Sequence, residues 1–210
     1  MTLQLQQIDE LLRPEHSFLT EQDHCFFLRE YTAGAGFGYG ETNNIISNLK
    51  KKVDRRGKSE WRYKEVAIQR AGNELCEALT DHLLRQFTIV PMPPSRSKAH
   101  PMYDDRVLRI VRAMTDGLGC DVRELVVQSN DMPAAHETKI RPRPEEWYAA
   151  YAIDEALTNP PPTNVLVIDD VLTAGAHFVG LKRRLVERFP GVTVFGVFYA
   201  RRAVQQDPEE

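Results

Sequence analysis

Two neighbouring carboxylates precede a short loop of small residues in the stretch 164–178, NVLVIDDVLTAGAHF. Asp169 and Asp170 follow four apolar residues that are typical of a buried strand. The loop 173–176 then leads into an expected helix. A helix N-terminus suits a phosphate, because its N–H groups and its dipole favour an anion. The acids cannot neutralise a phosphate, so they suit the hydroxyls of a ribose or a divalent metal. The stretch predicts binding of a phosphorylated sugar.

Other acid-site families fit this stretch less well. A VLVIDD strand also opens receiver domains, but only 40 residues follow Asp170, too few to complete that fold. Phosphatases of the haloacid type need their acids two residues apart, and these two are adjacent.

The run 165–176, VLVIDDVLTAGA, resembles the phosphoribosyl-pyrophosphate (PRPP) motif of type I phosphoribosyltransferases. Ala174 stands where many members have a second threonine, and His177 also replaces a threonine; a Thr-Ala-Gly version occurs in the orotate branch. The resemblance implies that Mg²⁺ accompanies the ribose at Asp169 and Asp170. It further implies a PRPP-binding set of Asp169, Asp170, Val171, Leu172, Thr173, Ala174, Gly175, Ala176 and His177.

A second run, 90-VPMPPSRSK-98, resembles the strand-end pyrophosphate loop of the ComF-like, competence-associated branch of that family. Residues 44–51 resemble the hood of that branch, and residues 197–202 its last strand. The resemblance implies Arg96 as a catalytic residue beside Asp169 and Asp170. It implies pyrophosphate binding by Pro94, Ser95, Arg96, Ser97 and Lys98.

The zinc-binding N-terminal segment of the ComF-like branch has no counterpart, because the chain contains no cysteine pairs. We therefore expect an N-terminal extension over residues 1–40 that is part of the hood. A phosphoribosyltransferase-like domain follows over 41–204, and a polar tail over 205–210. We expect the hood, which chooses the acceptor, to come from residues 25–64.

Two basic segments have alternative interpretations. The segment 136-HETKIRPRP-144 is either an exposed basic loop or a lid whose Lys139, Arg141 or Arg143 reaches the leaving group. The run 50-KKKVDRRGK-58 is basic at six of nine positions. It is a solvated surface or a contact for nucleic acid or a phosphorylated substrate.

The hydrophobic patterns predict alternating strands and helices. Strands are expected at 25–32, 87–93, 124–129, 164–170 and 192–200, and helices at 65–87, 104–118, 147–157 and 178–189. The glycines of 34–40 do not match a dinucleotide loop and indicate a turn. Continuously apolar strands favour an α/β fold, with a central parallel sheet flanked by helices and a small hood. His177 is expected on a helix surface, and Phe198 and Tyr199 in the strand core.

The composition is that of an ordinary globular domain, with 42% hydrophobic and 27% charged residues and a net charge of −3. No apolar run approaches the roughly 20 residues of a membrane helix. The N-terminus lacks the pattern of a signal peptide. Three scattered cysteines indicate reduced thiols and a cytoplasmic protein. A homodimer is compatible with these features.

The functional expectation is a glycosyltransferase that uses PRPP and Mg²⁺. It transfers phosphoribose to a nitrogen nucleophile and releases pyrophosphate. The acceptor stays open between a purine, a pyrimidine and another amine. The alternative is a module that senses PRPP or a nucleotide, or associates with nucleic acid, without turnover.

Overall fold

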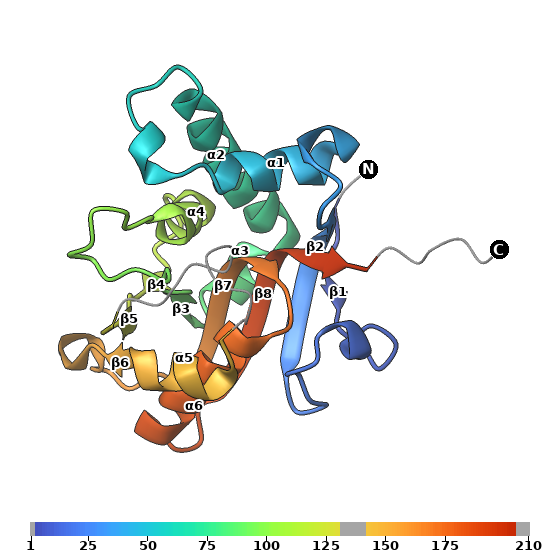
Figure 1. Ribbon diagram of the computed structural model, residues 1–210. Coiled ribbons are helices and arrows are strands. Elements are labelled where there is room, and N and C mark those ends of the chain that lie inside the picture. Colours follow the sequence, from blue (N-terminus) through green and yellow to red (C-terminus); the bar gives the residue numbers. More distant parts are fainter. Residues whose placement is uncertain (1–2, 131–141, 205–210) are drawn as a thin grey trace.

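The computed structural model describes residues 3–130 and 142–204. A six-stranded sheet in the order β1-β2-β8-β7-β3-β4 forms its centre (Figure 1). Every neighbouring pair in it is parallel except β1 and β2. The strands are β1 (Gln6–Gln7), β2 (His24–Thr32), β8 (Thr193–Ala203), β7 (Asn164–Leu172), β3 (Thr88–Pro91) and β4 (Asp121–Val122). The expected α/β fold with a mostly parallel sheet is confirmed.

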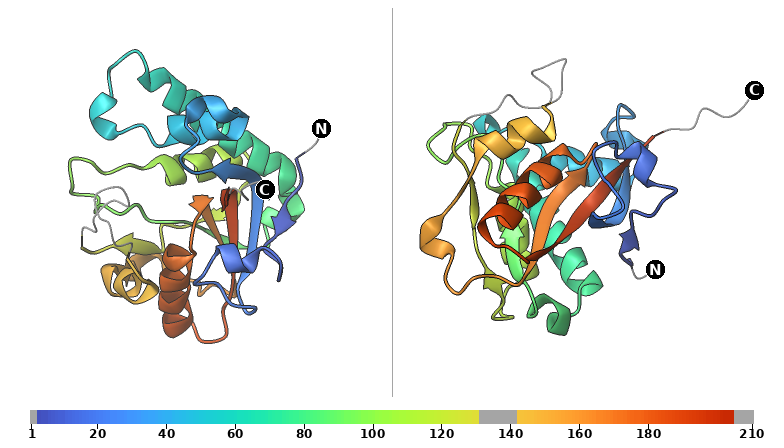
Figure 2. Two further views of the ribbon diagram at one scale, coloured as in Figure 1. Left: turned by 45° about the vertical axis from the view of Figure 1, so that its right-hand side comes forward. Right: turned by 90° about the horizontal axis from the view of Figure 1, so that it is seen from below.

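Helices cover both faces of the sheet (Figure 2). One face carries α1 (Glu41–Leu49), α2 (Trp61–Ala78) and α4 (Arg106–Met114); the other carries α5 (Pro144–Ala150) and α6 (Ala176–Arg188). The short helix α3 (Asp81–Leu84) follows α2, and single 3-10 turns are η1 (Arg13–Glu15), η2 (Phe37–Tyr39), η3 (Val53–Arg55) and η4 (Glu155–Leu157).

The pattern of β7 explains why both faces are covered. Val165 and Val167 lie in the core beneath α5 and α6, whereas Leu166 and Ile168 lie in the core beneath α2 and α4. Successive side chains of a strand point to opposite faces, so a continuously apolar strand must be buried on both.

The packing of α2 on α4 depends on one glycine. A Cβ atom at Gly72 would lie 2.5 Å from the Cβ atom of Ala113 and 3.0 Å from the carbonyl oxygen of Ile110. The two helices therefore approach more closely than larger side chains would permit. This contact fixes α4, which carries Arg106 toward the sheet.

One expected strand lies outside the central sheet, and two expected helices end early. The segment 124–129 forms β5 (Val126–Gln128), which pairs antiparallel with β6 (Tyr151–Ile153) in a separate small sheet. The helix expected at 147–157 ends at Ala150, because Tyr151 begins that strand and the Ala150 carbonyl accepts the Ser129 N–H at 2.8 Å. The long helix expected at 65–87 ends at Ala78.

The N-terminal region belongs to the same sheet as the rest of the chain. β2 pairs parallel with β8 from His24 to Thr32. Residues 25–32 therefore lie in the sheet and not in a hood, which was expected to begin at residue 25.

Within the described residues, no helix is long and apolar enough to cross a membrane.

Candidate functional site

Both acids of the opening stretch lie inside β7, close to its carboxyl end. Asp169 is 8% exposed and Asp170 is 4% exposed. Adjacent strand residues point to opposite faces, and these two have different surroundings. Asp170 reaches Arg106 of α4 on one face, whereas Asp169 lies near Tyr151 of β6. The carboxylates therefore do not act as one side-by-side clamp.

A buried ion network holds Asp170. Arg106 donates from Nε to Asp170 Oδ2 at 2.7 Å and from Nη1 to Asp104 Oδ2 at 3.0 Å. Lys64 of α2, which is fully buried, donates to the same Asp104 oxygen at 2.7 Å. The sequence-based site did not include Arg106, Asp104 or Lys64. Two further adjacent acids before an arginine, in 103-YDDR-106, were the available signal.

The pKa values of the two acids are shifted in opposite directions. Burial raises the pKa of Asp169 above its ordinary value, and the neighbouring charge of Asp170 raises it further. Burial alone would also raise the pKa of Asp170, but the charges of Arg106 and Lys50 lower it well below its ordinary range. Asp170 is therefore a fixed carboxylate, and Asp169 is the acid that more readily holds a proton.

The loop after β7 ends in a glycine that caps helix α6. Gly175 is the N-cap of α6 and has φ +90°, a left-handed conformation that favours glycine. The thirteen-residue helix α6 begins at Ala176, so the first N–H groups, including that of His177, have no partner within the helix. Thr173 and Ala174 complete the turn. These N–H groups and the helix dipole favour a bound anion.

The N-terminal segment covers this loop. The buried His16 ring forms a hydrogen bond through Nδ1 with the Thr173 carbonyl, and Phe18 N–H donates to the Ala174 carbonyl at 2.9 Å. A Cβ atom at Gly175 would lie 2.7 Å from the Leu19 side chain. The segment engages the carbonyl side of the loop. Sequence patterns gave no sign of this contact, because more than 150 residues separate the partners.

His177 was expected on the surface of a helix, but in α6 it is partly buried. Its ring is partly buried and lies against Trp147 of α5, with 3.6 Å between ring centroids and an interplanar angle of 75°. Burial lowers the pKa of His177 to about 4. The imidazole is therefore neutral at neutral pH and can offer one donor and one acceptor nitrogen. By contrast, Phe198 and Tyr199 are buried in the core, as expected.

The expected pyrophosphate loop follows the strand next to β7. Pro91 of β3 is in register with Ile168 of β7, so the loop 94–98 and the acid pair leave the same edge of the sheet. Within this loop, Pro94, Ser95, Arg96 and Ser97 are partly exposed, and Lys98 is exposed. Lys98 Nζ lies 2.9 Å from Glu124 Oε1, so its charge is already paired.

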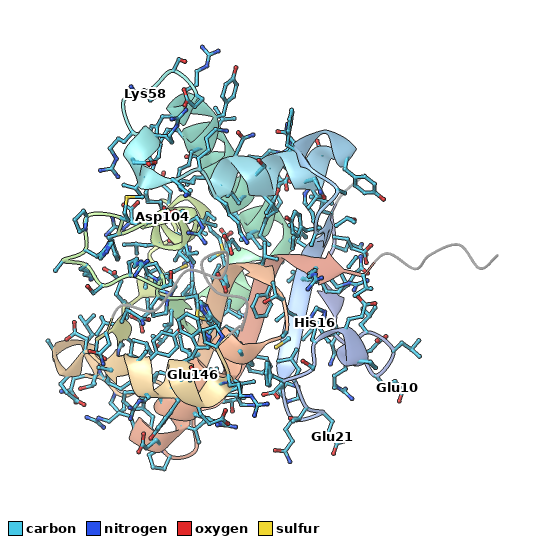
Figure 3. The ribbon with its side chains drawn as sticks, in the orientation of Figure 1. Glu10, His16, Glu21, Lys58, Asp104 and Glu146 are labelled. Atoms are coloured by element: carbon cyan, nitrogen blue, oxygen red, sulfur yellow. The ribbon has the colours of Figure 1, made fainter. Side chains whose placement is uncertain are left out.

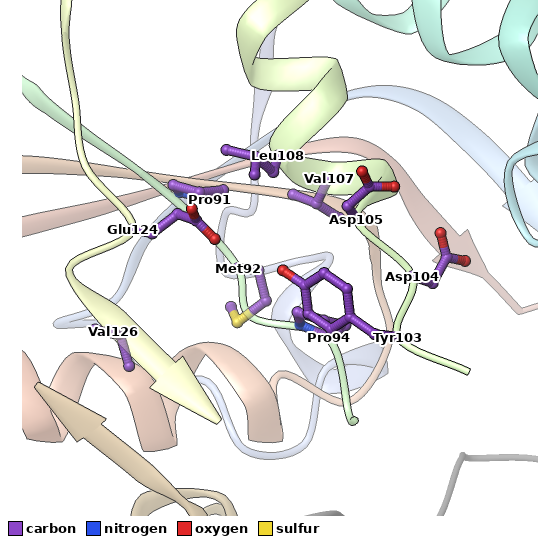
Figure 4. Close-up of a pocket in the computed structure, with 10 residues that line it drawn as sticks. All are labelled: Pro91, Met92, Pro94, Tyr103, Asp104, Asp105, Val107, Leu108, Glu124 and Val126. Carbon is purple, nitrogen blue, oxygen red and sulfur yellow. The ribbon is translucent and has the colours of Figure 1, made fainter. Parts of the chain in front are cut away.

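Pro94 also lines a small cavity with Met92, Tyr103 and Glu124 (Figure 4). Its volume of about 20 Å³ is enough for one water molecule and too small for a sugar phosphate. Burial raises the pKa of Tyr103 to about 12. This cavity therefore has no room for the expected substrate.

The expected lid is only partly within the described residues. Lys139 and Arg141 lie outside them. Arg143 is the N-cap of α5, and its backbone N–H donates to Glu146 Oε2 at 2.7 Å. The described part of the lid therefore starts a helix that packs on α6.

In the described chain, no group of three or more His, Cys, Asp or Glu side chains is arranged to hold a metal ion. Asp169 and Asp170 supply carboxylate oxygens, which suit Mg²⁺, but the remaining ligands would have to come from a bound molecule. No protein-family model matches the chain, and no curated protein matches it.

Proposed function

We propose that this protein binds PRPP with Mg²⁺ and transfers its phosphoribosyl group to a nitrogen nucleophile. One observation carries the proposal: β7 brings Asp169 and Asp170 to the start of a loop that ends in the Gly175 cap of α6. The two acids are thus only a few residues from the N-terminus of α6, which would bind the anion. This combination suits a ligand with both hydroxyls and a phosphate.

In this proposal, the 5′-phosphate is held by residues 173–177 and the ribose hydroxyls are held by Asp169. Asp170 acts mainly through its ion pair, since it holds Arg106 beside the ligand. Mg²⁺ would be held by Asp169 and the substrate's own oxygens, and would take up charge on the departing pyrophosphate.

The expected reaction displaces pyrophosphate from carbon 1 of the ribose through a transition state resembling an oxocarbenium ion, as in glycoside cleavage. Arg96 would stabilise the leaving group from the loop after β3. The bond from carbon 1 to the pyrophosphate oxygen breaks, and a bond from carbon 1 to nitrogen forms. The acceptor is a purine, a pyrimidine or another amine.

Calorimetric titration with PRPP, with and without Mg²⁺, tests the proposal. We expect magnesium-dependent binding that weakens about 10- to 150-fold in Asp169→Asn, equivalent to roughly 1.5–3 kcal/mol for a charged hydrogen bond. Asp116→Asn, an exposed acid after α4, is the matched control and should bind normally. Wild-type affinity in a double Asp169→Ala, Asp170→Ala variant would overturn the assignment, and so would no binding by folded wild-type protein.

Turnover separates the enzyme from a sensing module. Pyrophosphate release is followed with PRPP and panels of nucleobases and amines. Release that depends on one acceptor class supports transfer. Tight, magnesium-dependent binding without release from any acceptor favours the ligand-sensing alternative.

A further inference from the structure

The connection between α1 and α2 concentrates positive charge. Residues 50–63 contain seven basic and two acidic side chains, a net charge of +5 in a chain whose total is −3. Figure 3 shows Lys58 at the outer end of this connection, away from the sheet. The exposed basic residues are Lys50, Lys52, Arg55, Arg56, Lys58 and Arg62. A projecting surface with this charge attracts polyanions.

Aromatic rings lie among these charges. Tyr63 is 46% exposed, and the Arg62 guanidinium lies 4.8 Å from its ring centroid. The Lys51 ammonium lies 5.5 Å from the same centroid, and the Arg56 guanidinium lies 5.5 Å from that of Trp61. We call residues 50–63 the basic–aromatic surface. Rings stack on bases and guanidinium groups pair with phosphates, so the surface offers both contacts.

A buried lysine holds this surface in shape. Lys64 Nζ donates to the carbonyl oxygens of Leu49 at 2.7 Å and of Lys51 at 2.9 Å. These bonds join the end of α1 to the first turn of α2. A surface that is already ordered loses less conformational entropy when it binds a partner.

The start of the basic–aromatic surface is joined to the ion network of Asp170, because Lys64 bonds both the Lys51 carbonyl and Asp104. The charge of Lys50 contributes to lowering the pKa values of Asp170 and His177, after the larger effects of their surroundings. Lys50 is therefore close enough to act on the candidate site, while Lys58 lies at the far end of the same connection (Figure 3). A chain-like ligand on this surface would lead toward the site.

We propose that the basic–aromatic surface binds single-stranded nucleic acid. The exposed Tyr63 ring can stack on an unpaired base, whereas a duplex keeps its bases stacked inside. Membrane-surface segments need a broad apolar face, and here Tyr63 and Trp61 each lie beneath cations. The proposal does not depend on the binding of PRPP.

Fluorescence anisotropy with a labelled 20-nucleotide oligo(dT) and a matched duplex tests this surface. We expect the single strand to bind more tightly, with affinity that falls as salt rises. Tyr63→Ala should weaken binding about 5- to 150-fold through lost stacking. Arg55→Gln with Arg56→Gln should reduce the slope of log affinity against log salt by about 1.4, because each lost phosphate contact contributes about 0.7.

The matched control is Arg183→Gln with Arg188→Gln on α6, which removes the same charge from exposed arginines paired with Glu145 and Glu155. This variant should keep wild-type affinity. Equal losses in the two double variants, or an unchanged affinity in Tyr63→Ala, would overturn the proposal. Tighter binding to phosphatidylserine vesicles than to the oligonucleotide would also overturn it. Because the PRPP titration is separate, failure here leaves the proposed function standing.

Discussion

The ion pair between Arg106 and Asp170 gives a prediction whose size follows from the structure. The pair is short, 2.7 Å from Nε to Oδ2, and Asp170 is 4% exposed. Arg106→Met would leave a buried carboxylate without its partner. Breaking such a pair from one side costs about 3–5 kcal/mol. In a chain of this length, that loss lowers the melting temperature by roughly 6–20 °C.

Urea unfolding, followed by far-UV circular dichroism and tryptophan fluorescence, measures the loss. The matched control is Arg109→Met, one turn further along α4. Arg109 pairs with Glu65, and these side chains are 27% and 41% exposed. An exposed pair of this kind is worth about 1 kcal/mol or less. The two variants therefore remove the same side chain from the same helix and differ in the burial of its partner.

A double variant and a pH series complete the test. Arg106→Met with Asp170→Leu should recover much of the lost stability, since it removes the unpaired charge. The pKa of Asp170 is lowered in the folded protein, so its stabilisation is present above pH 3.8 and is lost as pH falls through the folded pKa. Arg106→Met should lose this acid dependence. A loss no larger than that of Arg109→Met would refute the reasoning.

Three further predictions concern other parts of the site. Because the pKa of His177 is lowered to about 4, the free energy of unfolding should fall by up to about 3 kcal/mol between pH 6.5 and 4; His177→Gln should flatten this decline in urea titrations. Gly175→Ala should destabilise more than Gly191→Ala, because both have positive φ but only Gly175 also meets Leu19; equal melting temperatures would contradict this. Lys64→Met should cost about 1–3 kcal/mol by chemical denaturation, since the Leu49 and Lys51 carbonyls lose this donor while Asp104 keeps Arg106; an unchanged stability would show that the network is dispensable.

The sequence determined the parts of this protein that depend on neighbouring residues. The run from Val165 to Ala176 predicted a strand, a turn and a helix in that order, and the structure contains β7, the Gly175 cap and α6. Periodicity is a local property, so the main strands and most helices followed from it. Continuous apolar strands also predicted the mostly parallel sheet, since such strands must be buried on both faces.

The sequence pattern predicted the wrong structure where a strand pairs with a distant segment of the chain. The residues after Ala150 have a helical pattern, yet Tyr151 begins a strand because Gln128 pairs with it. The strand at 126–128 was expected in the central sheet, but it pairs with β6 in a separate sheet. Strand partners are chosen by tertiary packing, which sequence periodicity does not encode.

The tertiary structure also decided the surroundings of the acids. Asp170 and Arg106 are 64 residues apart, and His16 and Thr173 are 157 apart, so neither contact leaves a spacing pattern. The alternation of strand side chains turns Asp169 and Asp170 toward different neighbours. The sequence therefore predicted which residues carry the chemistry, whereas folding decided which charge each acid meets. Charge interactions depend on distance and burial, and both arise only when remote segments pack together.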